Sequence, residues 1–161
     1  MQTILHYCRE FPETSVDSGV VLLNEGGRTG VLYILIEGRI EVLRGDFQVA
    51  TVTEPGAIFG EMSVLLDLPH TATVKTVAPS RLYIVQRAGE FLQSHTDITY
   101  QLAKVLAQRL HGVTTYLVDL KHQFQDQNNH LGMVDEVLKT LIHQQDEECD
   151  PGSDRYPDRT V

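Results

Sequence analysis

The chain has 161 residues, of which 42% are hydrophobic, and its 22 acidic side chains outnumber 13 lysines and arginines, giving a formal net charge of −9. This length predicts one domain with room for an additional helical segment. We expect no DNA partner, because phosphate contacts to duplex DNA need a basic surface.

The cysteine pattern and the lack of long apolar runs indicate in which cellular compartment the protein is expected. Cys8 and Cys149 lie near opposite ends of the chain and form no Cys-x-x-Cys pair, which is typical of a reducing environment. Residues 1–11 lack the basic segment and long apolar run of a signal peptide. No apolar stretch reaches the length of a bilayer span. We therefore expect a cytoplasmic protein without a membrane partner.

Short β-prone runs separated by glycine turns occupy residues 19–86. The run 39–44 alternates polar and apolar side chains, as a half-buried strand does. Runs at this even spacing predict a sandwich, barrel or roll. In the turn around Gly26 and Gly27, we expect Glu25 and Arg28 to be turn residues, with Arg28 in an ion pair. The predicted strands are 20–23, 32–36, 39–44, 48–52, 72–77 and 81–86.

Helical patterns replace the strands after Gln86. Residues 87–94 predict a short helix, and Asp97 is the expected N-cap of a long helix that reaches Gln125. A polar break over 125–130 precedes a final helix over 133–145. The acidic tail 146–161 contains two prolines and one glycine, so we expect it to be disordered. An amphipathic stripe in the final part is formed by Leu131, Val134, Leu138 and Leu141.

The long predicted helix carries apolar side chains at spacings of four and three residues, which is an a/d seam. One possibility is that the seam packs against the chain's own strands. The other, favoured by six seam positions, is a parallel two-helix homodimer. The seam residues are Leu106, Leu110, Val113, Leu117, Leu120 and Phe124.

The segment 59–74 is the main candidate for a ligand site. Gly60 permits backbone geometry that a side chain would block. The N–H groups of Gly60, Met62 and Ser63 favour an anion if a helical turn starts there. Glu61 offers two acceptor oxygens, which suit a pair of hydroxyl donors such as those of ribose. The alternative is a surface turn with a solvated glutamate.

These residues lie within a longer pattern. Over residues 11–124 the chain resembles the cyclic nucleotide-binding domain family, which includes catabolite activator proteins and regulatory subunits of the cyclic-AMP-dependent kinase. The resemblance lies in the order and spacing of several short motifs. They are Ser18-Gly19-Val20-Val21-Leu22, the run 32–42, Glu54-Pro55-Gly56, Phe59-Gly60-Glu61-Met62-Ser63-Val64-Leu65 and Ala72-Thr73-Val74.

The resemblance implies an α+β fold. Its centre is a double-stranded β-roll, jelly-roll-like, with about eight strands flanked by helices. A long C-terminal helix and one extra helix follow. The expected organisation is a cyclic nucleotide-binding-like domain over 1–125, an extra amphipathic helix over 126–145 and the acidic tail over 146–161.

The resemblance also implies the ligand-binding residues. Residues 59–74 would be the phosphate-binding cassette, with Glu61 on the ribose 2′-hydroxyl. Polar side chains on the long helix would reach the purine, although exposed seam-flanking positions are an equal alternative for those threonines. The implied ligand-binding residues are Gly60, Glu61, Met62, Ser63, His70, Thr71, Ala72, Thr114 and Thr115.

One position departs from the family pattern. Nucleotide-binding members usually carry arginine where this chain has His70. Arginine is always charged and binds phosphate through two donors, whereas histidine offers one nitrogen at a time. Losing most of a charged hydrogen bond weakens binding by about 10- to 100-fold. If His70 meets the phosphate as a cation, affinity rises as the pH falls through the imidazole pKa.

The function implied is a stand-alone sensory or regulatory module. It would bind cyclic AMP or cyclic GMP and signal through helix movement to a protein partner, because too few residues follow Gln125 for a DNA-binding module. The alternative is a degenerate domain that binds no nucleotide and serves dimerisation or protein interaction. We expect no enzyme activity, no catalytic residues and no cofactor. No metal site is expected either, because the seven histidines show no ligand spacing.

Overall fold

The computed structural model describes residues 2–123 and 131–143. The chain divides into two compact units, Met1–Lys104 and Val105–Val161. The first unit contains all eight strands of the described residues, and the second contains the later part of a long helix together with the last helix. The predicted boundaries at 125 and 145 stay predictions.

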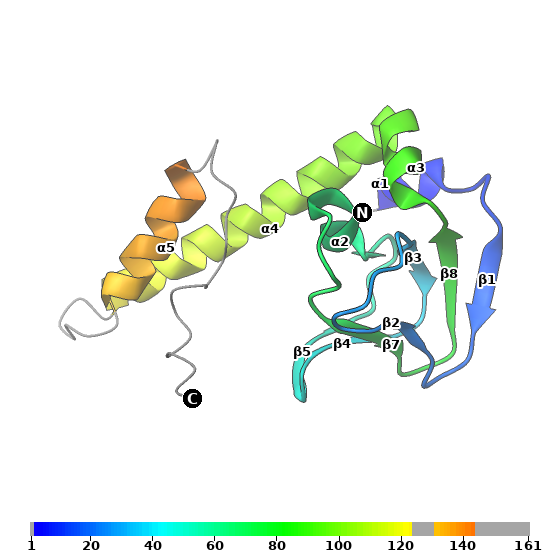
Figure 1. Cartoon of the computed structure of the whole chain (residues 1–161), viewed down its shortest axis with the longest axis horizontal. Helices are drawn as coiled ribbons and strands as arrows, with labels where there is room; N and C mark the ends of the chain where they lie inside the picture. The colour runs from blue at the N-terminus through cyan, green and yellow to red at the C-terminus, as the bar shows by residue number, and fades with distance from the viewer. Residues whose placement is uncertain (1, 124–130, 144–161) are drawn as a thin grey trace. The chain divides into compact units, whose positions relative to one another are not determined.

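Two four-stranded antiparallel sheets form the roll of the first unit (Figure 1). The order of the first sheet is β1-β8-β3-β6 and that of the second is β2-β7-β4-β5. The fold class predicted above is therefore confirmed. The strands of the first sheet, in that order, are Glu13–Val16, Ser80–Val85, Leu32–Glu37 and Ile58–Phe59. Those of the second are Val21–Leu23, Thr73–Thr76, Ile40–Arg44 and Phe47–Val52.

The hydrophobic core lies between the sheets. Its buried side chains come from strands of both sheets and from Ala57 just before β6, and several are completely shielded from solvent. Burying each such side chain contributes about 1.5–3 kcal/mol, so this shared core holds the two sheets together. The core residues are Leu23, Leu35, Ile40, Ala57, Phe59, Val74 and Leu82.

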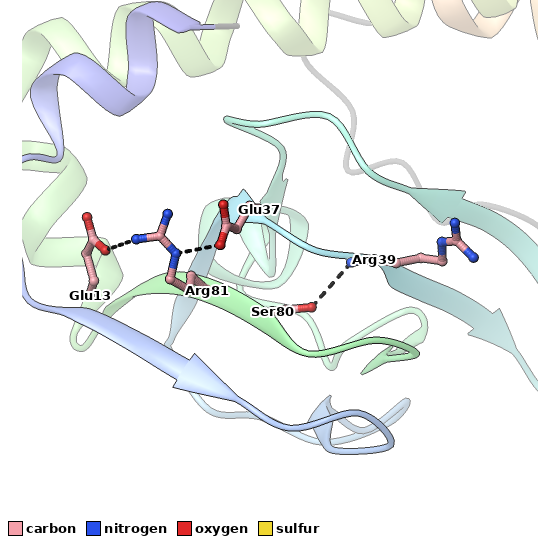
Figure 2. A network of polar contacts seen from close by, with 5 residues as sticks. All are labelled: Glu13, Glu37, Arg39, Ser80 and Arg81. Carbon is pink, nitrogen blue, oxygen red and sulfur yellow. Dashed lines mark hydrogen bonds and ion pairs between the residues drawn. The ribbon is translucent and has the colours of Figure 1, made fainter.

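An ion-pair network crosses the outer face of the first sheet (Figure 2). Arg81 on β8 pairs with Glu13 on β1 at 2.7 Å and with Glu37 on β3 at 2.8 Å. The hydrogen bond and charge of Arg81 hold the pKa of Glu37 below its usual value. Between β3 and β4, the backbone N–H of Arg39 donates to the Ser80 hydroxyl. The three charged side chains are near solvent, whereas Ser80 is buried, so the ion pairs add little stability but mark the register of three neighbouring strands.

Four helical elements belong to the first unit in whole or in part. Helices α1 and α3 lie beside the start of β1 and the end of β8 (Figure 1), and α2 packs against α3. Phe11 packs edge-on against Phe91 of α3, with ring centroids 5.2 Å apart. The helices are α1 (Gln2–Tyr7), α2 (Glu61–Leu66), α3 (Ala88–Ser94) and α4 (Thr96–Gln123), the last continuing into the second unit.

The second unit joins the later part of α4 to α5 (Leu131–His143). Lys121 of α4 donates a hydrogen bond to Asp135 of α5, and Lys139 lies 3.3 Å from the same carboxylate. These two lysines hold the pKa of Asp135 below its usual value. Leu138, one residue of the predicted stripe, is buried. The apolar face of the last helix thus packs at least through Leu138.

Several element boundaries differ from those predicted. The long helix begins at Thr96, so Asp97 lies in its first turn and is not the N-cap. The last helix begins at Leu131, before the predicted start at residue 133. Strands β1 and β6 and helix α1 were not predicted, because they are very short and β1 is mostly polar. The predicted helix end at Gln125, the polar break 125–130 and the tail 146–161 lie outside the described residues.

Candidate functional site

A glycine opens the candidate cassette. Gly60 has φ +93°, in the left-handed region that favours glycine, and α2 begins at the next residue. A Cβ at this position would lie 2.5 Å from the carbonyl oxygen of Val31 and 3.3 Å from Leu23. The requirement for glycine therefore has two causes, backbone conformation and close packing against the residues that flank the β2–β3 connection.

The side chains of α2 divide into a buried and an exposed set. Glu61 is 6% exposed and Ser63 is 9% exposed, whereas Met62 is 44% exposed. The Ser63 hydroxyl donates to the carbonyl oxygen of Leu68, and the backbone N–H of Leu68 donates to the carbonyl oxygen of Ser63. Ser63 therefore closes the turn that follows the helix, while Glu61 places a carboxylate in a largely water-shielded position at the start of α2.

His70 lies at the other end of the cassette and is 4% exposed. Its Nε2 lies 2.9 Å from the hydroxyl oxygen of Thr29. Its backbone makes two 2.8 Å hydrogen bonds, donating to the carbonyl oxygen of Gly27 and accepting from the N–H of Gly26. Burial lowers the pKa of the imidazole, which favours the neutral ring at pH 7.

The β2–β3 loop, residues 24–30, is tied to the cassette at further points. The guanidinium of Arg28 donates to the side chain and the carbonyl oxygen of Asp67, at 3.0 and 3.1 Å. The backbone N–H of Glu25 donates to the Thr73 hydroxyl. The predicted ion pair of Arg28 is thus confirmed. Since this pair is well exposed, its contribution to stability is small, and the backbone contacts of His70 are the firmer link.

Most of the predicted site residues lie in one continuous segment, 60–72, which packs against the β2–β3 loop. Gly60 and His70 both pack against the stretch between Leu23 and Val31, and Thr71 and Ala72 lead directly into β7. Thr71 is exposed and Ala72 is half-buried. The roles assigned to these residues, and to Gly60, Glu61, Met62, Ser63 and His70, stay predictions.

Thr114 and Thr115 belong to the second unit, on the later part of α4. Thr114 is half-buried and Thr115 is exposed. Their contact with a purine stays a prediction. Thr29 was not among the residues predicted from the sequence. It lies in a glycine-rich turn, and nothing in that turn indicates its contact with His70, 41 residues later.

A shallow groove of about 620 Å³ is a separate feature of the first unit. It is lined by residues of α2, α3 and the start of α4, and none of them is a predicted site residue. The groove is therefore distinct from the polar part of the cassette. Its lining residues are Val64, Leu65, Gly89, Leu92, Gln93, Thr96, Thr99, Tyr100 and Ala103.

Residues 2–123 and 131–143 hold neither a metal-binding cluster nor a membrane-spanning helix. Within them, no group of three or more potential metal-ligating side chains lies together. No helix in the same ranges has the length and hydropathy needed to cross a membrane. Cys8 is a buried free thiol, and burial raises its pKa to about 11. The cytoplasmic location stays a prediction.

Curated relatives match this chain over part of their own length. It is 30% identical over 108 residues to the CRP-like cAMP-activated global transcriptional regulator of Mycobacterium tuberculosis, covering 63% of this chain and 48% of that protein. It is 24% identical over 143 residues to lysophospholipase nte1 of Neurospora crassa, covering 85% of this chain and 9% of that protein. The chain thus spans about half of the regulator and less than a tenth of the lysophospholipase.

Solved structures share the fold. The catabolite activator protein of Thermus thermophilus superposes with a TM-score of 0.58 at 21% identity, covering 88% of this chain and 81% of that one. A structure described as Sp-2Cl-cAMPS bound to PKAR CBD2 gives a TM-score of 0.53 at 21% identity, covering 68% and 71%. The family model of the cyclic nucleotide-binding domain matches residues 13–93, which include all eight strands and the cassette. On this match over half of its length, the chain belongs to the cyclic nucleotide-binding domain family.

Proposed function

We propose that the chain binds a cyclic nucleotide, cyclic AMP or cyclic GMP, at the cassette and acts as a regulatory module without enzyme activity. The observation that carries this proposal is the buried carboxylate of Glu61, directly after a glycine whose conformation and packing exclude other residues. In a member of this family, such a carboxylate is placed to accept hydrogen bonds from ribose hydroxyls. The Mycobacterium tuberculosis relative is named as cAMP-activated, and PKAR CBD2 was solved with a cAMP analogue.

The remaining cassette residues would hold the cyclic phosphate. Gly60 and Met62 would contribute main-chain contacts, and Thr71 and Ala72 would bring N–H groups to the phosphate. The Ser63 hydroxyl is already bonded to Leu68, so Ser63 would contribute its backbone. Thr114 and Thr115 would reach the base from α4.

Ligand capture would be coupled to a partner surface on α4. In this proposal, the cassette helix moves when the phosphate is bound, and α4 passes the change to a homodimer interface or to another protein. The apolar seam of α4 supports this role, because Leu110 and Val113 are 45% and 52% exposed. The size of the response is limited by the difference in ligand affinity between the two states.

The second candidate function is a domain that has lost its ligand and acts as a dimerisation or protein-interaction module. The observation in its favour is His70, which replaces the family's arginine, is buried, and already has Nε2 bonded to Thr29. A neutral ring lacks the fixed charge that arginine brings to phosphate.

A thermal-shift experiment separates the two functions. Cyclic AMP and cyclic GMP should raise the melting temperature, since a ligand that binds only the folded state stabilises it, and 5′-AMP should not. Glu61→Gln removes one charged acceptor and should weaken binding by about 10- to 100-fold. Glu90→Gln is the matched control, because Glu90 is an exposed glutamate in the first turn of α3. No shift at millimolar cyclic nucleotide would overturn the proposed function.

A further inference from the structure

The contact between Thr29 and His70 defines where the imidazole carries its proton. The Thr29 hydroxyl oxygen also accepts a hydrogen bond from the backbone N–H of Val31, at 3.4 Å. A backbone N–H can only donate, whereas a hydroxyl has one proton of its own to give. This arrangement favours donation from the Thr29 hydroxyl to Nε2 of His70. A neutral imidazole that accepts at Nε2 carries its proton on Nδ1.

The packing of the ring directs Nδ1 away from the loop. Nε2 faces Thr29, and Cδ2 lies 3.7 Å from the position that a Cβ of Gly27 would occupy. The Nε2–Cδ2 edge of the ring therefore faces the β2–β3 loop, and Nδ1 lies across the ring from it. Two backbone hydrogen bonds to Gly26 and Gly27 fix the residue in this position.

Nδ1 is also accessible. Within residues 2–104 no hydrogen bond joins Nδ1 to another group, and every buried side-chain nitrogen or oxygen atom of the described residues has a partner. Nδ1 is thus not sealed inside the protein, although His70 is 4% exposed as a whole. An acceptor on a ligand would therefore meet Nδ1 from the side of the ring that faces away from the β2–β3 loop.

The charges around His70 are compatible with a neutral ring. The β2–β3 loop carries Glu25 and Arg28, the cassette carries Glu61 and Asp67, and Arg28 is neutralised by Asp67. Glu25 accepts a hydrogen bond from the backbone of Gly45, in the turn between β4 and β5. The pKa of His70 is lowered by burial, with no contribution from these groups.

We propose that Thr29 holds His70 as the Nδ1–H tautomer, so that the neutral imidazole donates a hydrogen bond from Nδ1 to a phosphate oxygen of the ligand. Thr29 is then a positioning residue, and its role in binding rests on the function proposed above. The arginine of other members is replaced by a donor whose action needs no added proton. This differs from the expectation, drawn from the sequence, that His70 acts as a cation.

The tautomer can be measured on the ligand-free chain by long-range ¹H–¹⁵N NMR of the histidine rings, with His70→Gln assigning the signal. We expect the Nδ1–H form at pH 7.5 in the wild type and in Thr29→Ser, which keeps the hydroxyl. Thr29→Val removes the hydroxyl and should shift the ring towards the Nε2–H form or an exchanging mixture. An Nε2–H form in the wild type, or no change in Thr29→Val, would overturn the assignment.

The role in binding is read from the affinity for cyclic AMP and cyclic GMP between pH 7 and pH 8.5. A neutral donor predicts a change of less than about twofold, whereas a ring that must first be protonated predicts about tenfold per pH unit. Thr29→Val should bind about 5-fold more weakly, with affinity restored in Thr29→Ser. A tenfold fall per pH unit would overturn the proposal. Absence of any binding would overturn the proposed function and the ligand contact, while the NMR result on the free chain still decides the tautomer.

Discussion

The cassette and the long helix α4 differ in which kind of side chain they bury and which they expose. In the cassette, the polar side chains of Ser63 and His70 are buried and bonded to the chain itself. On α4, the apolar side chains of Leu110, Val113 and Tyr116 are exposed. Buried polar groups must be paired to avoid a desolvation cost, and exposed apolar groups gain by meeting a partner. The polar groups of the cassette are therefore fixed by the chain itself, whereas α4 leaves apolar side chains exposed, as the proposed association would require.

The largest expected effect compares one glycine in each region. Gly60→Ala should lower the free energy of unfolding by about 2–6 kcal/mol, because it combines backbone strain with a clash against Val31. Gly112→Ala on α4 has open space around it and should raise the same quantity by up to about 1 kcal/mol. Urea unfolding of both variants measures the difference, and similar values for the two would contradict the packing described for the cassette.

The second effect concerns the exposed face of α4. If this face forms a homodimer, the double variant Leu110→Glu/Val113→Glu should weaken association by about 100-fold, because two apolar side chains lose their burial. Gln108→Glu, an exposed neighbour on the same helix, should leave association within about twofold. Light scattering over a range of concentrations measures the mass. A wild-type chain that is monomeric at every concentration would contradict a homodimer through this face.

The third effect restores the family's usual residue in the cassette. His70→Arg should tighten cyclic nucleotide binding by about 10- to 100-fold, since arginine supplies a fixed charge and two donors. The comparison with Thr29→Val is informative, because that variant changes the histidine without adding charge. Binding by His70→Arg but not by the wild type would favour the degenerate-domain alternative.

The smallest effect is a pH dependence of stability. The pKa of His70 is lowered in the folded state, so the unfolded chain binds the proton more tightly. The contribution of the neutral His70 ring to the free energy of unfolding is therefore fully present above the ordinary histidine pKa of about 6.5. This contribution is lost as the pH falls below that value. Urea unfolding at pH 7.5 and pH 5.5 should show a smaller loss for His70→Gln than for the wild type. His111→Gln, at an exposed position on α4, is the control that should behave as the wild type.

The sequence predicted the parts of the fold whose signals are local. The alternation in β4, the glycine turns and the spacing around Gly60 and Glu61 are read within a few residues. Strands β1 and β6 were not predicted, because β6 has only two residues and β1 has no clear apolar face.

The contact of Thr29 with His70 could not be predicted, because the roll topology alone brings these positions together across 41 residues. The burial of His70 has the same origin. A polar residue in a loop sequence indicates solvent exposure, and only the hydrogen bonds of Gly26 and Gly27 to its backbone bring it inside. The sequence identified the residue in question but not its environment.

The most direct test of a preorganised nucleotide site is calorimetric titration of the whole chain with cyclic AMP and cyclic GMP, with 5′-AMP as the non-cyclic comparison. We predict saturable binding of at least one cyclic nucleotide, a clear loss in Glu61→Gln, and no binding of 5′-AMP. No heat up to millimolar cyclic nucleotide, in a chain that unfolds cooperatively, would contradict the account.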